Sequence, residues 1–182
     1  MTHTHHLAME SVTQLTDEPK HFAGCCLAIS KPLLQALLST LPGGSALVFS
    51  VGCGSGLLEG LLLQASGSEI NLFGIEVTSC TCTFLPSKRA LRVSDTRALH
   101  PDAILASVLV FVYPRVPALV ASYIDTCATG AMEKLVWLGH RSDWADSEKI
   151  IFDSFADVQV VENAGLPDHE IMVVATAPKS SA

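Results

Sequence analysis

The chain has 182 residues, of which 49% are hydrophobic and 16% charged, and it carries a formal net charge of −7. This composition indicates one globular domain with a sizeable core and excludes a disordered chain. The acidic balance argues against a nucleic-acid partner, because nucleic acids bind basic surfaces. No apolar run reaches the roughly 18–20 residues that span a membrane, so no membrane partner is expected either.

The first residues are polar and rich in histidine, unlike a signal peptide, so we expect a cytoplasmic protein with reduced thiols. The first 18 residues show no clear period; we predict a flexible segment over residues 1–20 and a single domain over residues 21–182. Neither Cys25-Cys26 nor Cys80-x-Cys82 has the paired spacing of zinc ligands, and we interpret the cysteines as small buried thiols. No metal site is expected.

Hydrophobic periodicity and chain-breaking residues predict alternating helices and strands. A first helix starts at Ser30 with Pro32 and stops at Pro42-Gly43-Gly44. Further helices are predicted over residues 56–65, 117–127 and 142–156. Strands are predicted over residues 46–51, 71–77, 90–94, 134–138, 158–161 and 171–176.

Residues 98–113 allow two interpretations. Either a short helix runs from His100 through Ala106 and a strand follows from Val108 to Tyr113, or a strand starts already at Ala103. The last two predicted strands are joined by a link too short for a parallel crossover, so they must pair antiparallel or lie apart.

The turn after the first strand holds glycines at alternate positions, Gly52, Gly54 and Gly56, and a predicted helix follows at once. Strand, glycine turn and helix form a nucleotide-binding layout, because glycine allows positive φ and close approach of a ligand to the helix N-terminus. The spacing does not fit Gly-x-Gly-x-x-Gly, and the Gly-Lys-Ser/Thr ending of a phosphate loop is absent. Glu76, at the end of the next strand, lies 20 residues after Gly56, where a carboxylate can accept hydrogen bonds from both ribose hydroxyls.

The Gly-x-Gly-x-Gly turn and Glu76 resemble motifs of class I S-adenosylmethionine (SAM) methyltransferases, over about residues 25–177. The resemblance implies an α/β fold: a Rossmann-like, doubly wound, mostly parallel seven-stranded sheet with one antiparallel strand near the edge. It also implies SAM as cofactor, bound by Gly52, Cys53, Gly54, Gly56 and Glu76. Asp95, followed by Thr96, matches a position that receives the adenine amino group, although Asp95 suits equally well a cap of the next segment.

Ligands of open parallel sheets bind beyond the carboxyl ends of the strands, where Tyr113 and His140 also lie. Methyl transfer depends mainly on positioning, and an oxygen or nitrogen acceptor also needs a base. His140 is the candidate base because imidazole titrates near neutral pH; the alternative is a histidine satisfied in the loop after its strand. Tyr113 either shapes the acceptor pocket or packs in the core. We place His21 in a possible lid and His169 in the far hairpin.

The motif of adenine- or glutamine-directed amino-methyltransferases is absent, as are the metal-binding carboxylates of catechol-type enzymes and a large substrate domain. We therefore expect methyl transfer to a small organic acceptor. The strings Gly-Ser-Gly-Leu-Leu-Glu and Phe-Val-Tyr-Pro-Arg resemble small methyltransferase-like proteins of fungal metabolism, which implies secondary metabolism. The alternative is a methyltransferase-like scaffold without methyl transfer: a cyclase or isomerase, or a partner-binding subunit. A homo-oligomer is compatible with either.

Overall fold

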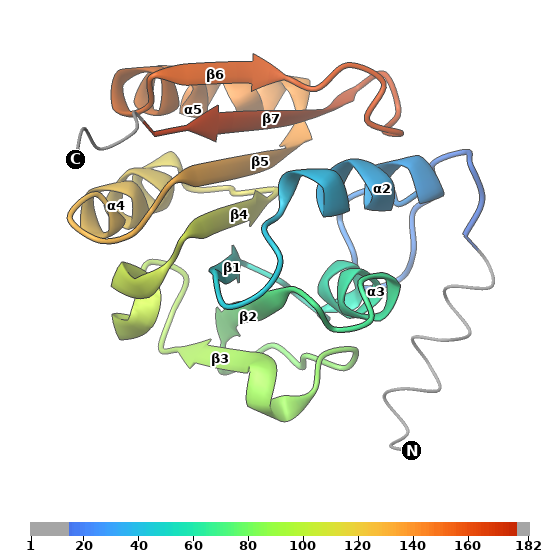
Figure 1. The fold of residues 1–182 in the computed structure, drawn as a ribbon, viewed down its shortest axis with the longest axis horizontal. Coiled ribbons are helices and arrows are strands. Elements are labelled where there is room, and N and C mark those ends of the chain that lie inside the picture. The colour runs from blue at the N-terminus through green and yellow to red at the C-terminus, as the bar shows by residue number, and fades with distance from the viewer. Residues whose placement is uncertain (1–14, 178–182) are drawn as a thin grey trace.

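A seven-stranded sheet runs through the middle of the molecule in the order β3-β2-β1-β4-β5-β7-β6 (Figure 1). This computed structural model describes residues 15–177. The strands are β1 Leu47–Val51, β2 Asn71–Val77, β3 Ala90–Val93, β4 Val108–Val112, β5 Lys134–His140, β6 Asp157–Val160 and β7 Glu170–Thr176. All neighbours pair in parallel except β7, which is antiparallel to both β5 and β6.

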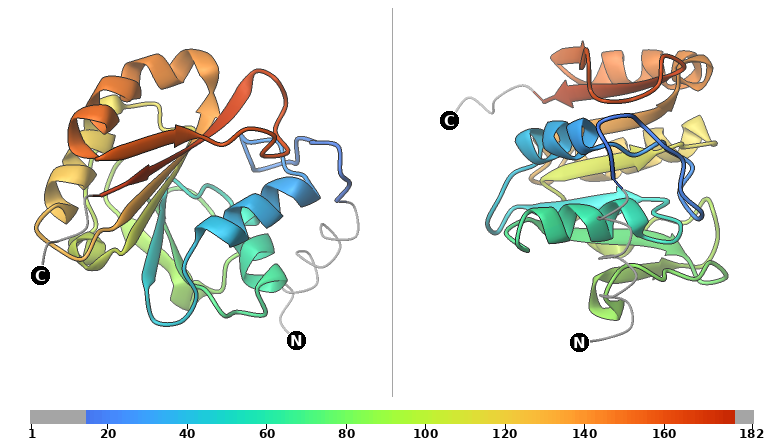
Figure 2. Two further views of the ribbon diagram at one scale, coloured as in Figure 1. Left: turned by 45° about the horizontal axis from the view of Figure 1, so that its top comes forward. Right: turned by 90° about the vertical axis from the view of Figure 1, so that its right-hand side faces the viewer.

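Helices cover both faces of the sheet (Figures 1 and 2). They are α2 Lys31–Thr40, α3 Leu57–Ala65, α4 Pro117–Cys127 and α5 Arg141–Ser154, with short 3-10 helices η1 Ser87–Arg89 and η2 Pro101–Leu105. The buried residues of α2 and α3 form one core cluster with the sheet, and those of α4 and α5 form the other. None of the helices described is long and apolar enough to cross a membrane.

The alternation of side chains along the strands divides the two cores. In β1, Val48 packs on the α2–α3 side and its neighbour Phe49 on the α4–α5 side. In β5, Val136 and Trp137 divide in the same way. The strands β1, β4, β5 and β7 are buried on both faces, which explains their nearly continuous apolar sequences, whereas the edge strands β3 and β6 are more exposed.

The first helix begins where its capping residues predict. The Ser30 side chain accepts a hydrogen bond from the Leu33 amide at 3.1 Å, and a proline follows within the first turn. The same hydroxyl donates to the Gly165 carbonyl at 2.6 Å. The N-cap of α2 therefore also anchors the turn between β6 and β7.

The predicted fold class and strand order along the chain are confirmed, with boundaries shifted by one or two residues at most elements. The stretch 98–113 adopts the first interpretation, a short helix followed by a strand. The last two strands pair antiparallel. Of the predicted flexible segment, residues 1–14 lie outside the described residues; within residues 15–20, Leu15 is buried and Lys20 pairs with Ile29.

Candidate functional site

The glycine turn between β1 and α3 is held in a conformation that other residues rarely adopt. Gly52, Gly54 and Gly56 have φ values of 77°, 56° and 75°. The Gly52 amide donates to the Ile75 carbonyl at 2.9 Å, which ties the turn to β2. A Cβ on Gly52 would meet nothing within 4 Å, so a ligand can approach the backbone here.

Glu76 lies beside this turn because β2 pairs in parallel with β1. Its Oε2 accepts from the Gly54 amide at 2.7 Å and its Oε1 from the Val77 amide at 2.8 Å. A carboxylate offers about four acceptor positions, so both oxygens retain capacity for further donors. The two amides orient the carboxylate toward the cavity that the turn borders.

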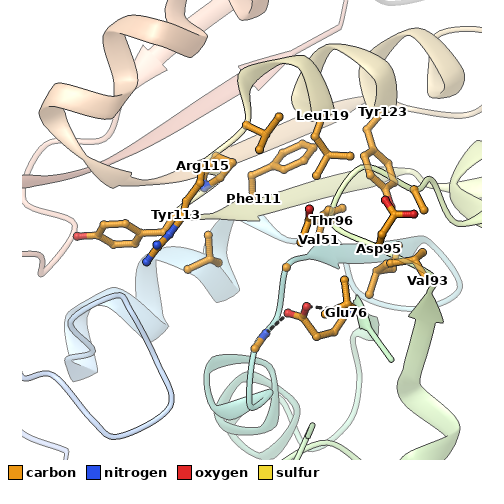
Figure 3. Close-up of a pocket in the computed structure, with 18 of the residues that line it drawn as sticks. Val51, Glu76, Val93, Asp95, Thr96, Phe111, Tyr113, Arg115, Leu119 and Tyr123 are labelled. Atoms are coloured by element: carbon orange, nitrogen blue, oxygen red, sulfur yellow. Dashed lines mark hydrogen bonds between the residues drawn. The ribbon is translucent and has the colours of Figure 1, made fainter. Parts of the chain in front are cut away.

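A cavity of about 310 Å³ opens at the carboxyl ends of the strands (Figure 3). Its polar side holds Glu76 with Gly52 and Gly54 of the turn, and Phe111, Leu119 and Tyr123 form an apolar wall opposite. The volume falls in the range of small-molecule sites, which are mostly apolar with a few oriented polar groups. This arrangement suits a ligand with a hydroxylated sugar and a flat apolar ring.

Asp95 and Thr96 also line this cavity, after the end of β3. Asp95 accepts from the Arg97 amide at 2.8 Å and from the Ser94 hydroxyl at 3.0 Å. The hydrogen bond from Arg97 is the main reason that the pKa of Asp95 lies below its ordinary value. The carboxylate therefore caps the next segment and borders the cavity, so the two interpretations of this residue do not exclude each other.

Cys53 and Gly56, also predicted to bind cofactor, lie behind the turn and do not line this cavity. A Cβ on Gly56 would come within 2.8 Å of the Cys82 sulfur and 2.9 Å of Leu85. The Cys53 thiol is buried, 3.7 Å from that of Cys82, and both cysteines are free. Glycine is thus required at position 56 by packing against the segment after β2.

Tyr113 follows β4 and connects two cavities. Its φ of 51° turns the chain at the strand end, and its hydroxyl donates to Glu170 Oε1 at 2.5 Å. Burial and this bond raise the pKa of Tyr113 above its ordinary value. The half-buried side chain lines the first cavity and a second one of about 560 Å³, which agrees with a pocket wall better than with a core residue.

His140 ends β5 and begins α5 without an intervening loop. Its Nδ1 accepts from the Ser142 amide at 3.2 Å, so the imidazole is the N-cap of α5. It lines the second cavity with Asp143 and Asp146, and its ring lies 5.5 Å from that of His169. His140 is therefore separated from the first cavity by the Tyr113–Arg115 segment that both cavities share.

Two buried carboxyl groups were missed by the sequence reasoning. Glu59 stands in the first turn of α3, where a carboxylate suits the helix dipole, but it is 2% exposed and its Oε1 accepts from the Ser50 hydroxyl at 2.5 Å. Glu170 is also 2% exposed and received no role. The one available signal for Glu59 was a polar serine inside an apolar strand nine residues earlier, which needs a partner when buried.

No protein-family model matches the chain, and no curated protein matches its sequence. Its fold matches solved structures. Over 81% of its length it superposes on 53% of the S-adenosylmethionine-dependent methyltransferase SibL in its apo form, at 13% identity and a TM-score of 0.58. Over 80% of its length it also superposes on 54% of the pyocyanin biosynthetic protein PhzM, at 15% identity and a TM-score of 0.59.

The precorrin-6y C5,15-methyltransferase from Geobacter metallireducens GS-15 matches over all of its length and 91% of this chain, at 12% identity and a TM-score of 0.62. The chain spans about half the length of SibL and PhzM. It has the Rossmann-like fold of class I SAM-dependent methyltransferases.

Proposed function

We propose that this protein is a SAM-dependent methyltransferase that acts on a small organic acceptor. The observation that carries the proposal is the 310 Å³ cavity that brings an open glycine turn and the oriented carboxylate of Glu76 to one edge of the sheet. SAM supplies a methyl group bonded to a sulfonium sulfur, and the acceptor displaces this sulfur as the neutral thioether S-adenosylhomocysteine. Because the thioether is a good leaving group, positioning is the main task of the protein.

The residues of this cavity fit SAM by chemical type. Glu76 retains acceptor capacity for the ribose hydroxyls, and the turn leaves the backbone at Gly52 open to the methionine part. Asp95 and Thr96 offer polar atoms to the adenine edge, beside the apolar wall. Cys53 and Gly56 support the turn from behind.

The second cavity is the proposed acceptor site. It shares Tyr113, Pro114 and Arg115 with the first cavity, so an acceptor there would meet the methyl group beside Tyr113. The net charge of −7 favours a small molecule over nucleic acid. PhzM and the glycopeptide N-methyltransferase MtfA bear names that refer to natural products, which supports a place in secondary metabolism.

His140 and Tyr113 are the proposed catalytic residues, with His140 as base and Tyr113 as the wall that orients the acceptor. Because His140 also caps α5, its removal has two consequences that must be separated. Asparagine is a good N-cap but no base. His140→Asn should therefore lose turnover by about 10²–10⁴-fold, as His140→Ala should, while keeping the stability of α5. Normal turnover in His140→Asn would assign the histidine to capping alone.

The alternative function is a scaffold without methyl transfer, which would display a large exposed apolar patch for a partner. Among residues 15–177 the exposed large hydrophobic side chains are Ile104, Leu105, Phe152 and Val160, divided between η2, α5 and β6. The cavity favours the enzyme. A homo-oligomer remains compatible with the proposal, as does a cytoplasmic location, which the six free thiols support.

Calorimetry with SAM and S-adenosylhomocysteine tests the cofactor. We expect binding of both ligands and its loss in Gly54→Val, because a β-branched side chain would occupy ligand space. Gly44→Val is the matched control: Gly44 also has positive φ, 75°, with nothing near its Cβ position, and it lies outside the cavity. Absence of binding at millimolar concentration, or equal loss in both variants, would contradict the proposed site.

A further inference from the structure

Three potential metal ligands from distant parts of the chain meet beside the proposed site. His21, His169 and Glu170 each offer one ligand atom, and these atoms lie within 4.8 Å of one another. His21 belongs to the N-terminal segment before α2, whereas His169 and Glu170 stand at the start of β7. On the sequence alone, His21 is placed in a possible lid and His169 in the far hairpin, and no metal site is expected.

Glu170 is buried without a cationic partner. Its Oε1 accepts from the Tyr113 hydroxyl at 2.5 Å and its Oε2 from the Ala28 amide at 3.2 Å. Both donors are uncharged, and the ion pairs of residues 15–177 do not include Glu170. Buried carboxylates are usually paired with a cation or coordinate a metal. The two donors orient the carboxylate as outer-shell partners orient metal ligands, and each oxygen keeps free acceptor capacity.

The backbone on both sides of the cluster is fixed by hydrogen bonds. Lys20, next to His21, pairs with Ile29 in both directions, at 2.8 and 3.1 Å. The His169 carbonyl accepts from the Arg141 amide and the Glu170 amide donates to the Pro167 carbonyl, both at 2.9 Å. The ligands thus converge from two anchored segments.

Only side-chain rotation is needed to close the site. An ion about 2.1 Å from each ligand atom brings those atoms to roughly 3.4 Å from one another in tetrahedral geometry. Both imidazoles are exposed, so their rings can turn inward, while the buried carboxylate stays in place.

We propose that His21, His169 and Glu170 form a binding site for a divalent transition-metal ion, zinc by preference. Two imidazole nitrogens and one carboxylate oxygen are a common zinc ligand set with an open fourth position, and they disfavour magnesium and calcium, which take oxygen ligands. The site uses residues outside the 310 Å³ cavity and does not rest on the proposed methyl transfer.

The bound ion joins the N-terminal segment to β7. Residues 20–29 form a loop closed by the Lys20–Ile29 bridge, and this loop also contacts the glycine turn, since the Gly24 carbonyl accepts from the Ser55 hydroxyl at 2.8 Å. Cys26 of the same loop lines the proposed cofactor cavity. The ion therefore acts as a clip that orders this loop over the site.

The test is zinc binding to the full chain after chelator treatment, followed by calorimetry and metal analysis. All proteins carry alanine at His3, His5 and His6, so that the histidine-rich start contributes no ligands. We expect one zinc ion per chain and at least a tenfold loss of affinity in His21→Ala and in His169→Ala. His100→Ala is the control, because His100 lies at the start of η2 and is not in the cluster.

Three further measurements complete the test, and the first two keep it independent of folding defects and of thiols. Glu170→Gln retains an acceptor for Tyr113 but should lower zinc affinity at least tenfold, at unchanged circular dichroism. Cobalt bound in place of zinc should give a spectrum without thiolate-to-metal charge transfer. Protection of amides 20–29 from hydrogen exchange should rise with zinc and stay unchanged by zinc in His21→Ala. No zinc binding, or equal binding by all variants, would overturn the proposal whatever SAM calorimetry shows.

Discussion

The carboxyl group of Glu59 makes a prediction about stability and pH. It is 2% exposed, its Oε1 is bonded by the Ser50 hydroxyl, and its Oε2 has no partner among residues 15–177. Burial raises the pKa of Glu59 from 4.5 to about 7, against the opposing effect of the Ser50 hydrogen bond and with a further small increase from the negative charge of Glu76.

The direction of the pH dependence follows from proton binding. Between pH 4.5 and about 7 the folded protein holds a proton on Glu59 that the unfolded chain has released, so the free energy of unfolding falls as pH rises. The difference of about 2.5 between the folded and unfolded pKa corresponds to a loss of roughly 3 kcal/mol in the free energy of unfolding. This loss is complete above pH 7 and absent below pH 4.5.

Glu59→Gln removes this titration and keeps an oxygen for Ser50. The variant should unfold with nearly wild-type free energy at pH 4.5 and be more stable by roughly 3 kcal/mol at pH 8. Urea unfolding, followed by the fluorescence of the buried Trp137 and Trp144, measures this difference while other titrations cancel. Ser50→Ala should shift the titration of Glu59 upward. Parallel pH profiles of the wild type and Glu59→Gln would refute the reasoning.

Outcomes are also expected for four further variants. Glu76→Ala should weaken SAM binding by about 1–3 kcal/mol in calorimetry, because it removes acceptors for the ligand. Its free energy of unfolding should fall by less than this. Gly165→Ala should cost about 2–4 kcal/mol in urea unfolding, since its φ is +74° and the new Cβ would lie 2.5 Å from the Ser30 hydroxyl. Gly67→Ala, with positive φ and open space, should cost only about 1–2 kcal/mol. Trp137→Ala, at a fully buried site, should cost about 3–5 kcal/mol.

Local features of the sequence were sufficient for most of the fold. Ser30 caps α2 as predicted, and the apolar runs form buried strands, because caps and periodicity depend on neighbouring residues. The glycine turn and Glu76 also met as predicted, since parallel strands bring their carboxyl ends to one edge. That β7 lies between β5 and β6 was not predicted, because the short link fixes only the antiparallel direction.

The sequence by itself determined the order of helices and strands, the glycine turn and the carboxylate that faces it. Only the tertiary structure decided which distant side chains meet. It brings His21 to His169 and Glu170, and it places the Glu170 carboxylate on the Ala28 amide. The physical reason is that hydrogen bonds and ligand sets form between atoms a few ångströms apart in space, and residues separated by well over 100 positions in the chain leave no local pattern that records such proximity.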